Sequence, residues 1–148
     1  MAFRLLKEDF AFPIQDVREV VQMTAVTPVP QAPSAIVGMV DARGEIVPVV
    51  NLRALLGLSS APPEVNARLI VVEFVSPEGP GKRVLGCLAD GMTRILRIPR
   101  HLISPAPPEL RRSCRVDLDG IARIEGRLIM ILRAATLLSP SELTQLPA

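Results

Sequence analysis

Few side chains in this chain of 148 residues are of the types that carry out acid–base, nucleophilic or metal chemistry. The sequence has one histidine, His101, in a proline-bounded segment, and two cysteines, Cys87 and Cys114, in separate strand-like stretches. A structural or catalytic zinc site needs three or four such ligands. We therefore predict no metal site and no cofactor. We interpret the cysteines as buried free thiols, because disulfides belong to oxidising compartments and the N-terminus does not resemble a secretion signal.

Sequence motifs of catalysis are also absent. The chain contains no GxSxG, no HExxH and no glycine-rich dinucleotide fingerprint. The fragment Gly79-Pro80-Gly81-Lys82 resembles part of a phosphate-binding loop, but Ser76 replaces the first glycine and Arg83 the required hydroxyl residue. Asp41 and Asp90 lie in predicted turns, where bonding to the backbone is a sufficient explanation for an acid. We predict that the chain is not an enzyme, although two distant carboxylates could still meet in the fold.

Charge is unevenly distributed along the chain. Residues 1–93 carry a net charge of −2, and residues 94–148 carry +4. A basic surface for nucleic acid is one interpretation. However, the chain has no Tyr or Trp, and its four Phe residues lie outside the basic segment, so none is placed there to stack on bases. We therefore favour a basic face turned to solvent or to a protein partner. The arginines of this segment are Arg94, Arg97, Arg100, Arg111, Arg112 and Arg115.

The segment that positions the candidate binding residues is residues 30–58. Two β-branched runs, 36–40 and 46–50, flank the polar stretch 41–45, which predicts a hairpin whose glycine takes a positive φ. At the tip, Arg43 lies between two acids, either of which could pair with it. Pro48 donates no ladder hydrogen bond, so we expect an edge strand or a bulge there.

A short helix should follow this hairpin. Residues 52–56 place leucines at helical spacing, Asn51 or its neighbour ends the strand, and Gly57 ends the helix. Upstream, residues 3–14 predict another hairpin, and the alternation of Phe10, Phe12 and Ile14 predicts one buried face. Frequent short strands with Gly and Pro turns predict an all-β barrel protein with short helices.

The second half of the chain partly repeats the first. Asp90-Gly91 predicts a tight turn between two strands. Residues 116–132 then predict another hairpin, and from Gly126 onward the chain echoes the central segment, with a glycine turn, an apolar strand and Leu-Arg-Ala. Two similar lobes would produce this echo, and so would chance similarity of amphipathic segments. Residues 139–142 form a capping-box pattern that predicts a C-terminal helix.

The central segment resembles the signature of CheW-type chemotaxis coupling domains. The resemblance continues in Val17-Arg18-Glu19-Val20-Val21 and Ala89-Asp90-Gly91-Met92, and it covers about Phe3 to Leu143. The chain departs from the family pattern at Asp41-Ala42, where the family usually has Asn-Leu. The matching positions of the central segment are Pro30, Pro33, Gly38, Arg43, Gly44, Ile46, Pro48, Leu52, Arg53 and Gly57.

The resemblance implies one CheW-like domain over residues 1–148, built of two intertwined five-stranded SH3-like β-barrel lobes and a C-terminal helix. The expected first lobe is residues 15–66, and the second comprises residues 1–14 and 67–148. No apolar run reaches the length of a membrane span. We therefore expect a cytoplasmic protein that is recruited to receptor arrays.

The resemblance also implies a non-catalytic adaptor that couples chemoreceptors to a CheA-type histidine kinase. The expected partners are the kinase regulatory domain, the cytoplasmic tip of the receptors and other CheW-like domains. Neither nucleic acid nor membrane insertion is expected. The family's partner-binding positions map onto Val17, Glu19, Gly38, Asp41, Arg43, Gly44, Pro48, Arg53, Asp90 and Gly91.

Two alternatives remain open from the sequence. The chain could serve a related chemosensory pathway, controlling pili, gliding or a second messenger, with different partners. It could also be a basic β-barrel that binds nucleic acid, an interpretation that depends only on the arginine cluster. Binding that survives high salt would argue against the second alternative, because phosphate contacts are salt-labile.

Overall fold

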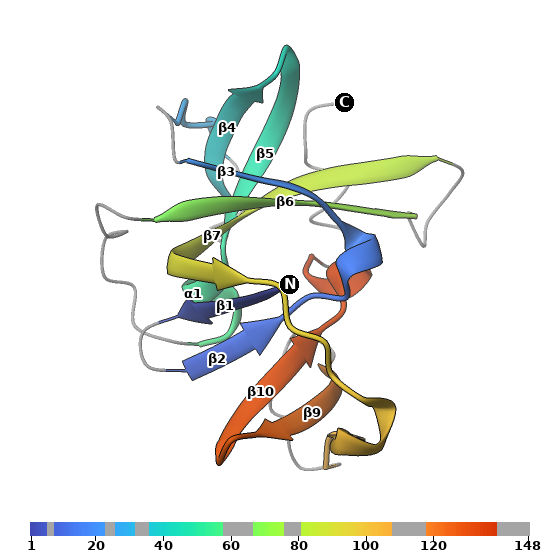
Figure 1. Ribbon diagram of the computed structural model, residues 1–148. Coiled ribbons are helices and arrows are strands. Elements are labelled where there is room, and N and C mark those ends of the chain that lie inside the picture. Colours follow the sequence, from blue (N-terminus) through green and yellow to red (C-terminus); the bar gives the residue numbers. More distant parts are fainter. Residues whose placement is uncertain are drawn as a thin grey trace.

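The computed structural model describes residues 1–5, 8–22, 26–31, 36–57, 67–75, 81–107 and 118–138 and consists mainly of β-strands (Figure 1). The fold class predicted from the sequence, all-β with short helices, is confirmed. None of the helices in these ranges is long and apolar enough to cross a membrane. The elements in chain order are β1 (Ala2–Leu5), β2 (Glu8–Ala11), η1 (Ile14–Asp16), β3 (Val17–Gln22), β4 (Ile36–Ala42), β5 (Glu45–Asn51), α1 (Leu52–Leu55), β6 (Arg68–Val75), β7 (Lys82–Arg94), η2 (Arg100–Leu102), β8 (Ile103–Ser104), β9 (Leu118–Ile124), β10 (Arg127–Leu132) and η3 (Ala134–Thr136).

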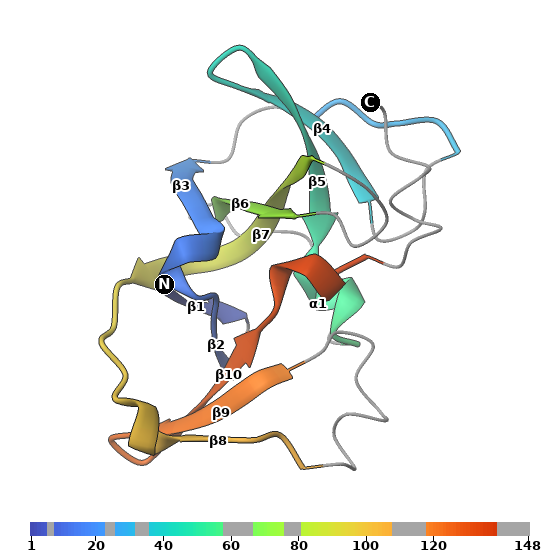
Figure 2. The same cartoon turned by 90° about the vertical axis from the view of Figure 1, so that its right-hand side faces the viewer.

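The strands pair in two groups that share β7. In the first group β6 lies between β3 and β7, and β5 joins β4 to residues 86–88 of β7. In the second group β2 lies between β1 and β10, and β9 lies between β10 and β8. Residues 82–89 of β7 pair with β6, and its last residues pair with β1. Figure 2 shows β7 running from one group to the other.

The pairing differs from two expectations. Strand β6 pairs with β3, and residues 86–88 of β7 pair with β5, whereas the expected boundary at residue 66 assigned both strands to the second lobe. Asp90 and Gly91 form no turn, because both lie inside the continuous strand β7. The register with β1 shifts here, from Arg4 opposite Asp90 to Phe3 opposite Thr93, which marks a bulge. Ladders with β6 and then β1 keep this stretch extended and override the local turn signal.

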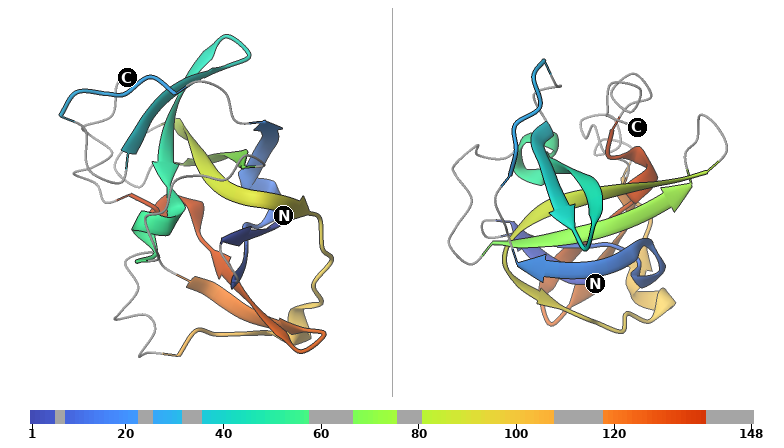
Figure 3. Two further views of the ribbon diagram at one scale, coloured as in Figure 1. Left: turned by 90° about the vertical axis from the view of Figure 1, so that its left-hand side faces the viewer. Right: turned by 90° about the horizontal axis from the view of Figure 1, so that it is seen from above.

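The predicted central hairpin is present as β4 and β5. Its two-residue turn has Arg43 at φ 55° and Gly44 at φ 84°, the pair of positive values that a type I′ turn requires. The hairpin of β9 and β10 has the same kind of turn, with Glu125 at φ 51° and Gly126 at φ 77°. The sequence echo therefore corresponds to two similar hairpins, which lie at opposite ends of the molecule (Figure 3).

The end of the first hairpin is shaped by Pro48 and Asn51. Pro48 faces Met39 of β4, and the parallel ladder with β7 starts only at Val49, so the missing N–H faces no second strand. Asn51 caps α1, because its side chain accepts hydrogen bonds from the backbone N–H groups of Arg53 and Ala54. The helix ends before Gly57, which has φ 72°.

The main core lies between the two strand groups. It joins Phe12 of the N-terminal segment and Leu132 at the end of β10 to Ile70 and Leu85 of β6 and β7, all nearly inaccessible to solvent. Cys87 is part of this core as a free thiol, and burial raises the pKa of that thiol. Cys114 and the predicted C-terminal helix at residues 139–142 lie outside the described residues.

Candidate partner-binding site

The tip of the β4–β5 hairpin is braced by an ion pair to β3. Nη1 of Arg43 lies 3.4 Å from Oε2 of Glu19, and the arginine side chain is 81% exposed while that of the glutamate is 19% exposed. The partner of Arg43 is therefore neither of its neighbouring acids. Glu19 and Arg43 are 24 residues apart in the sequence. The family resemblance mapped each of them to partner binding, and the structure brings the two together.

Each acid beside Arg43 has another role. Asp41 accepts a hydrogen bond from the backbone N–H of Gly44 at 2.8 Å and so closes the turn. Glu45 pairs with Arg18 of β3, with Nη1 and Oε2 2.7 Å apart. Asp41 stands where the family usually has asparagine, and the turn is compatible with either residue. An aspartate oxygen accepts this hydrogen bond as an asparagine oxygen would.

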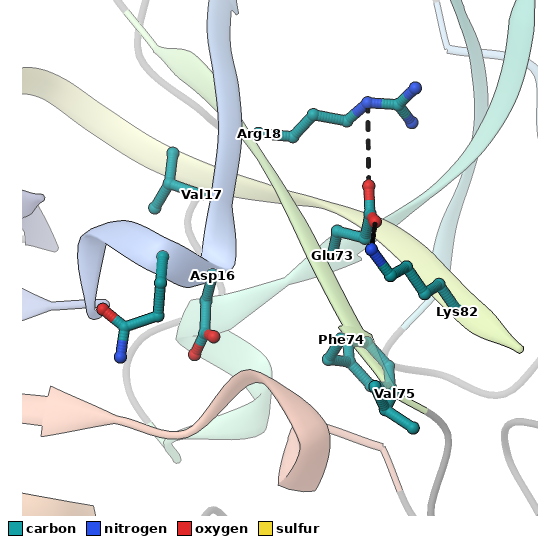
Figure 4. A pocket seen from close by; sticks show the side chains of 8 residues that line it. Asp16, Val17, Arg18, Glu73, Phe74, Val75 and Lys82 are labelled. Atoms are coloured by element: carbon teal, nitrogen blue, oxygen red, sulfur yellow. Dashed lines mark ion pairs between the residues drawn. The ribbon is translucent and has the colours of Figure 1, made fainter.

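Arg18 also lies near Glu73, so the ion pairs at the hairpin continue to β6 and β7. The register of β3 against β6 shifts between Val17 and Glu19, a bulge that includes Arg18. Figure 4 shows Glu73 between Arg18, at 3.8 Å, and Lys82, at 3.2 Å. Sequence reasoning missed these contributors, because the ladders of β6 bring them together and no local motif marks them.

The pocket drawn in Figure 4 lies beside these ion pairs. Val17 lines it together with Phe74 and Val75 of β6. Val17 is half-buried, and Val75 is 66% exposed. The predicted residue Val17 therefore lines a pocket that is partly apolar and partly charged, since Arg18, Glu73 and Lys82 line it as well.

Gly38 and Pro48 contribute to the hairpin backbone. Both are buried, so neither offers side-chain surface to a partner. A Cβ built on Gly38 would overlap the carbonyl oxygen of Thr27. This close approach fits the bridge in which Thr27 and Met39 exchange two backbone hydrogen bonds of 2.8 Å.

Arg53 and Asp90 form a separate, buried pair. Nη2 of Arg53 lies 2.6 Å from Oδ2 of Asp90, and the two side chains are 6% and 12% exposed. The pair joins α1 to β7 where β7 begins to pair with β1, beside Gly91. The structure therefore brings these predicted residues together at the junction of the strand groups and does not place them at the hairpin tip.

Comparison with known proteins agrees with this architecture. The family model for the CheW-like domain matches residues 1–142. The chain belongs to the CheW-like domain family. It is 34% identical to the chemotaxis protein CheW of Rhizobium meliloti (strain 1021) over 142 residues, 96% of this chain and 87% of that protein. It is 32% identical to the protein FrzA of Myxococcus xanthus, covering 97% of this chain and 82% of the relative.

A solved structure also resembles this CheW-like chain. The crystal structure of the scaffolding protein TtCheW from Thermoanaerobacter tengcongensis superposes with a TM-score of 0.79 at 26% identity. The match covers 95% of this chain and 87% of that one. The SH3-like barrel lobes inferred from the sequence fit this fold.

The CheW-like chain also has a groove that sequence reasoning missed. It holds about 400 Å³ and is lined by residues that include Ile14, Leu96, Ile98 and Arg100. Ile14 was expected to be buried by its alternation with Phe10 and Phe12, but it is 52% exposed. The alternation ends because the 3-10 helix η1 begins at Ile14, after Pro13.

Proposed function

We propose that the chain is a non-catalytic adaptor of a chemosensory system that couples chemoreceptors to a CheA-type histidine kinase. The observation that carries the proposal is the family match, which spans residues 1–142 and therefore both strand groups. The adaptor acts in the cytoplasm, recruited to receptor arrays. It requires no bound cofactor and no chemical step of its own.

The hairpin tip is a suitable contact surface for such an adaptor. Arg43 is exposed, yet its turn and its pair with Glu19 limit its freedom. Ile46, three residues further along, exposes 68% of its surface. Arginine is enriched at the centre of protein interfaces, where apolar surface is also removed from water.

The pocket beside β3 supports a second contact. Val17 and Glu19 lie on the same strand, with Val17 facing the pocket and Glu19 bracing the hairpin. We propose that Val17, Glu19, Asp41, Arg43 and Gly44 form or shape the surface on which kinase and receptor meet. Gly38, Pro48, Arg53, Asp90 and Gly91 support that surface from within the fold.

Reconstitution tests the proposal. A soluble receptor tip fragment held on vesicles, a CheA-type kinase and this chain are mixed, and both co-sedimentation and kinase autophosphorylation are measured. We expect the chain to be required for kinase to sediment with receptor and for kinase activity to respond to receptor. Kinase that sediments equally well without the chain would contradict the adaptor role.

A related pathway is the second candidate, because the match to FrzA is nearly as high in identity as that to the Rhizobium protein. The same assay with kinases and receptors from separate chemosensory systems of one organism distinguishes the pathways. The cognate pair is the one with which the chain forms the ternary complex at the lowest concentration.

A further inference from the structure

The strands of the first group leave a seam between β3 and the β4–β5 hairpin. Within the described residues, β3 pairs with β6 along one edge only, and no backbone hydrogen bond crosses from its other edge to the hairpin. Two ion pairs cross the seam instead, Arg18 with Glu45 at 2.7 Å and Glu19 with Arg43 at 3.4 Å. We propose that these two pairs form a latch, and that the hairpin tip, residues 41–46, opens away from β3 when the latch breaks. The latch belongs to this chain itself, so its opening can be measured without a partner and does not depend on the proposed function.

The bulge in β3 builds the latch. Consecutive residues of a regular strand point to opposite faces of the sheet. Arg18 and Glu19 are consecutive, yet both pair with the same hairpin. The register of β3 against β6 shifts between Val17 and Glu19, and such a bulge re-aims the side chains beside it. The bulge thereby directs two neighbouring charges of opposite sign at one hairpin.

A hollow lies beneath the latch. It holds about 160 Å³ and is lined by the four latch residues together with Ala42, Val47 and Val71. Because this space is not filled by apolar side chains, the tip is joined to β3 mainly by charge. Val47 and Val71 each expose only 1% of their surface in the closed state. Opening of the tip would bring water to these two valines and would separate Arg43 from Glu19.

The base of the hairpin is fixed, which confines the movement to its tip. The parallel ladder of β5 with β7 begins at Val49. Val40 and Val47 belong to the apolar cluster of the first strand group, with 3% and 1% of their surface exposed. Beyond them, the tip residues have no ladder partner outside the hairpin among the described strands, and Figure 2 shows the tip extending past β6 and β7. The tip can therefore move on its base without breaking a ladder to another strand.

The similar hairpin of β9 and β10 is held in a different way. Near its tip, Arg127 lies 2.7 Å from Asp9 of β2, whose side chain is only 11% exposed and lies 3.3 Å from Arg4 as well. In the latch, by contrast, the two arginine side chains are 45% and 81% exposed. Exposed ion pairs are weak and are screened by salt, whereas pairs that include a buried charge are screened much less. Salt should therefore open the first hairpin and leave the second closed.

The test measures the distance between two nitroxide labels by pulsed electron spin resonance. The labels are attached at Ile46→Cys on the tip and at Gln22→Cys on β3, both of which are exposed positions. The native thiol of Cys87 is buried and should not react, and Cys114→Ser removes the other native thiol. Distances are recorded at low salt and at about 1 M salt, where the screening length falls to about 3 Å. We expect one main population at low salt and a second population, at longer distance, that grows with salt.

Charge variants test the latch at constant salt. Glu19→Lys/Glu45→Lys places positive charges on both sides of the seam and should raise the population at longer distance by about tenfold at low salt. Adding Arg43→Glu restores one pair with exchanged charges and should lower that population again. The matched control is Asp119→Lys, which breaks the 2.7 Å pair with Arg133 in the second strand group and should leave the distance distribution as in the wild type.

The salt series needs none of the charge substitutions, so it decides the question even if the double variant does not fold. A distance distribution that stays the same from low to high salt would overturn the latch. So would an unchanged distribution in a folded Glu19→Lys/Glu45→Lys variant. Equal opening in the Asp119→Lys control would also overturn it, because the movement would then follow from the loss of any surface ion pair.

Discussion

Glu19 and Arg43 join strand β3 to the turn of the β4–β5 hairpin, with 3.4 Å between carboxylate and guanidinium. Arg18 and Glu45 add a second pair of opposite polarity between the same two elements, at 2.7 Å. The hairpin tip is thereby held from one side by two adjacent residues of β3. This arrangement places Arg43 beside Glu19 at the surface without burying it.

Replacement of Arg43 separates stability from function. The pair is exposed on the arginine side, so its loss should cost only about 0–1 kcal/mol. We expect Arg43→Ala to shift the melting temperature by no more than a few degrees, while ternary assembly with kinase and receptor falls sharply. Thermal unfolding and co-sedimentation measure the two effects, with Arg123→Ala as the control for removal of an exposed arginine. Normal assembly and kinase activation by Arg43→Ala would show that the hairpin tip is not the contact surface.

Reversal of Glu19 tests whether the pair itself matters. Glu19→Lys places two positive charges side by side and should displace Arg43, so receptor binding should weaken while the fold stays intact. The double variant Glu19→Lys/Arg43→Glu restores opposite charges with exchanged positions. If the pair only orients the hairpin, the double variant regains binding in the co-sedimentation assay. If Arg43 itself contacts the partner, the double variant stays impaired in binding. Unchanged binding by the single variant Glu19→Lys would contradict both roles.

Gly44 tests the hairpin turn. Its φ is 84°, and no atom lies within 4 Å of a Cβ built there, so substitution is penalised by backbone strain and not by a clash. We expect Gly44→Val to cost on the order of 1–3 kcal/mol and to lower the melting temperature clearly. Gly44→Asn, which tolerates positive φ better, should cost less. Equal melting temperatures for the two variants would show that strain at this position does not limit stability.

The buried pair of Arg53 and Asp90 should contribute to the integrity of the fold. Arg53→Met leaves a carboxylate that is 12% exposed without this guanidinium, which should cost about 3–5 kcal/mol of unfolding free energy. Adding Asp90→Asn removes the negative charge that Arg53 faced and should recover part of the loss. Denaturant unfolding measures both values. A double variant no more stable than Arg53→Met would show that the cost arises from lost packing of the arginine stem and not from the charge of Asp90.

Asp16 should make the protein less stable as pH rises. Burial, and to a lesser extent the charge of Asp119, raises the pKa of Asp16 above its usual value. The folded state therefore binds this proton more tightly than the unfolded state, and stability falls as pH increases from the unfolded pKa of about 3.9 through the raised folded value. We expect Asp16→Asn to raise the melting temperature at pH 7 relative to wild type, and the difference to shrink towards pH 3. A gain that is the same at both pH values would show that the effect is not electrostatic.

Local sequence predicted the elements whose conformation depends on neighbouring residues. The turn at Arg43 and Gly44 could be predicted as a hairpin with a glycine at positive φ, because a polar stretch with a glycine between two β-branched runs favours one. The cap by Asn51 and the helix end at Gly57 follow from equally short-range chemistry. The match of spaced residues to the CheW signature added the fold class and the family, both confirmed. The partner-binding roles mapped from that signature stay predictions.

Long-range strand pairing decided the rest. Asp90 and Gly91 carry a turn signal, yet ladders with β6 and β1 hold them in one strand, because paired backbone groups on both neighbours outweigh a local preference. The partner of Arg43 was decided in the same way, since β3 reaches the hairpin through β6, β7 and β5, and no spacing in the sequence encodes that path. The exposure of Ile14 at the groove likewise depends on where η1 interrupts the alternation and on which distant strands pack beside it. Side chains far apart in sequence meet only where strand pairing brings their strands together. Which strands pair depends on the free energy of the whole fold and not on any local segment.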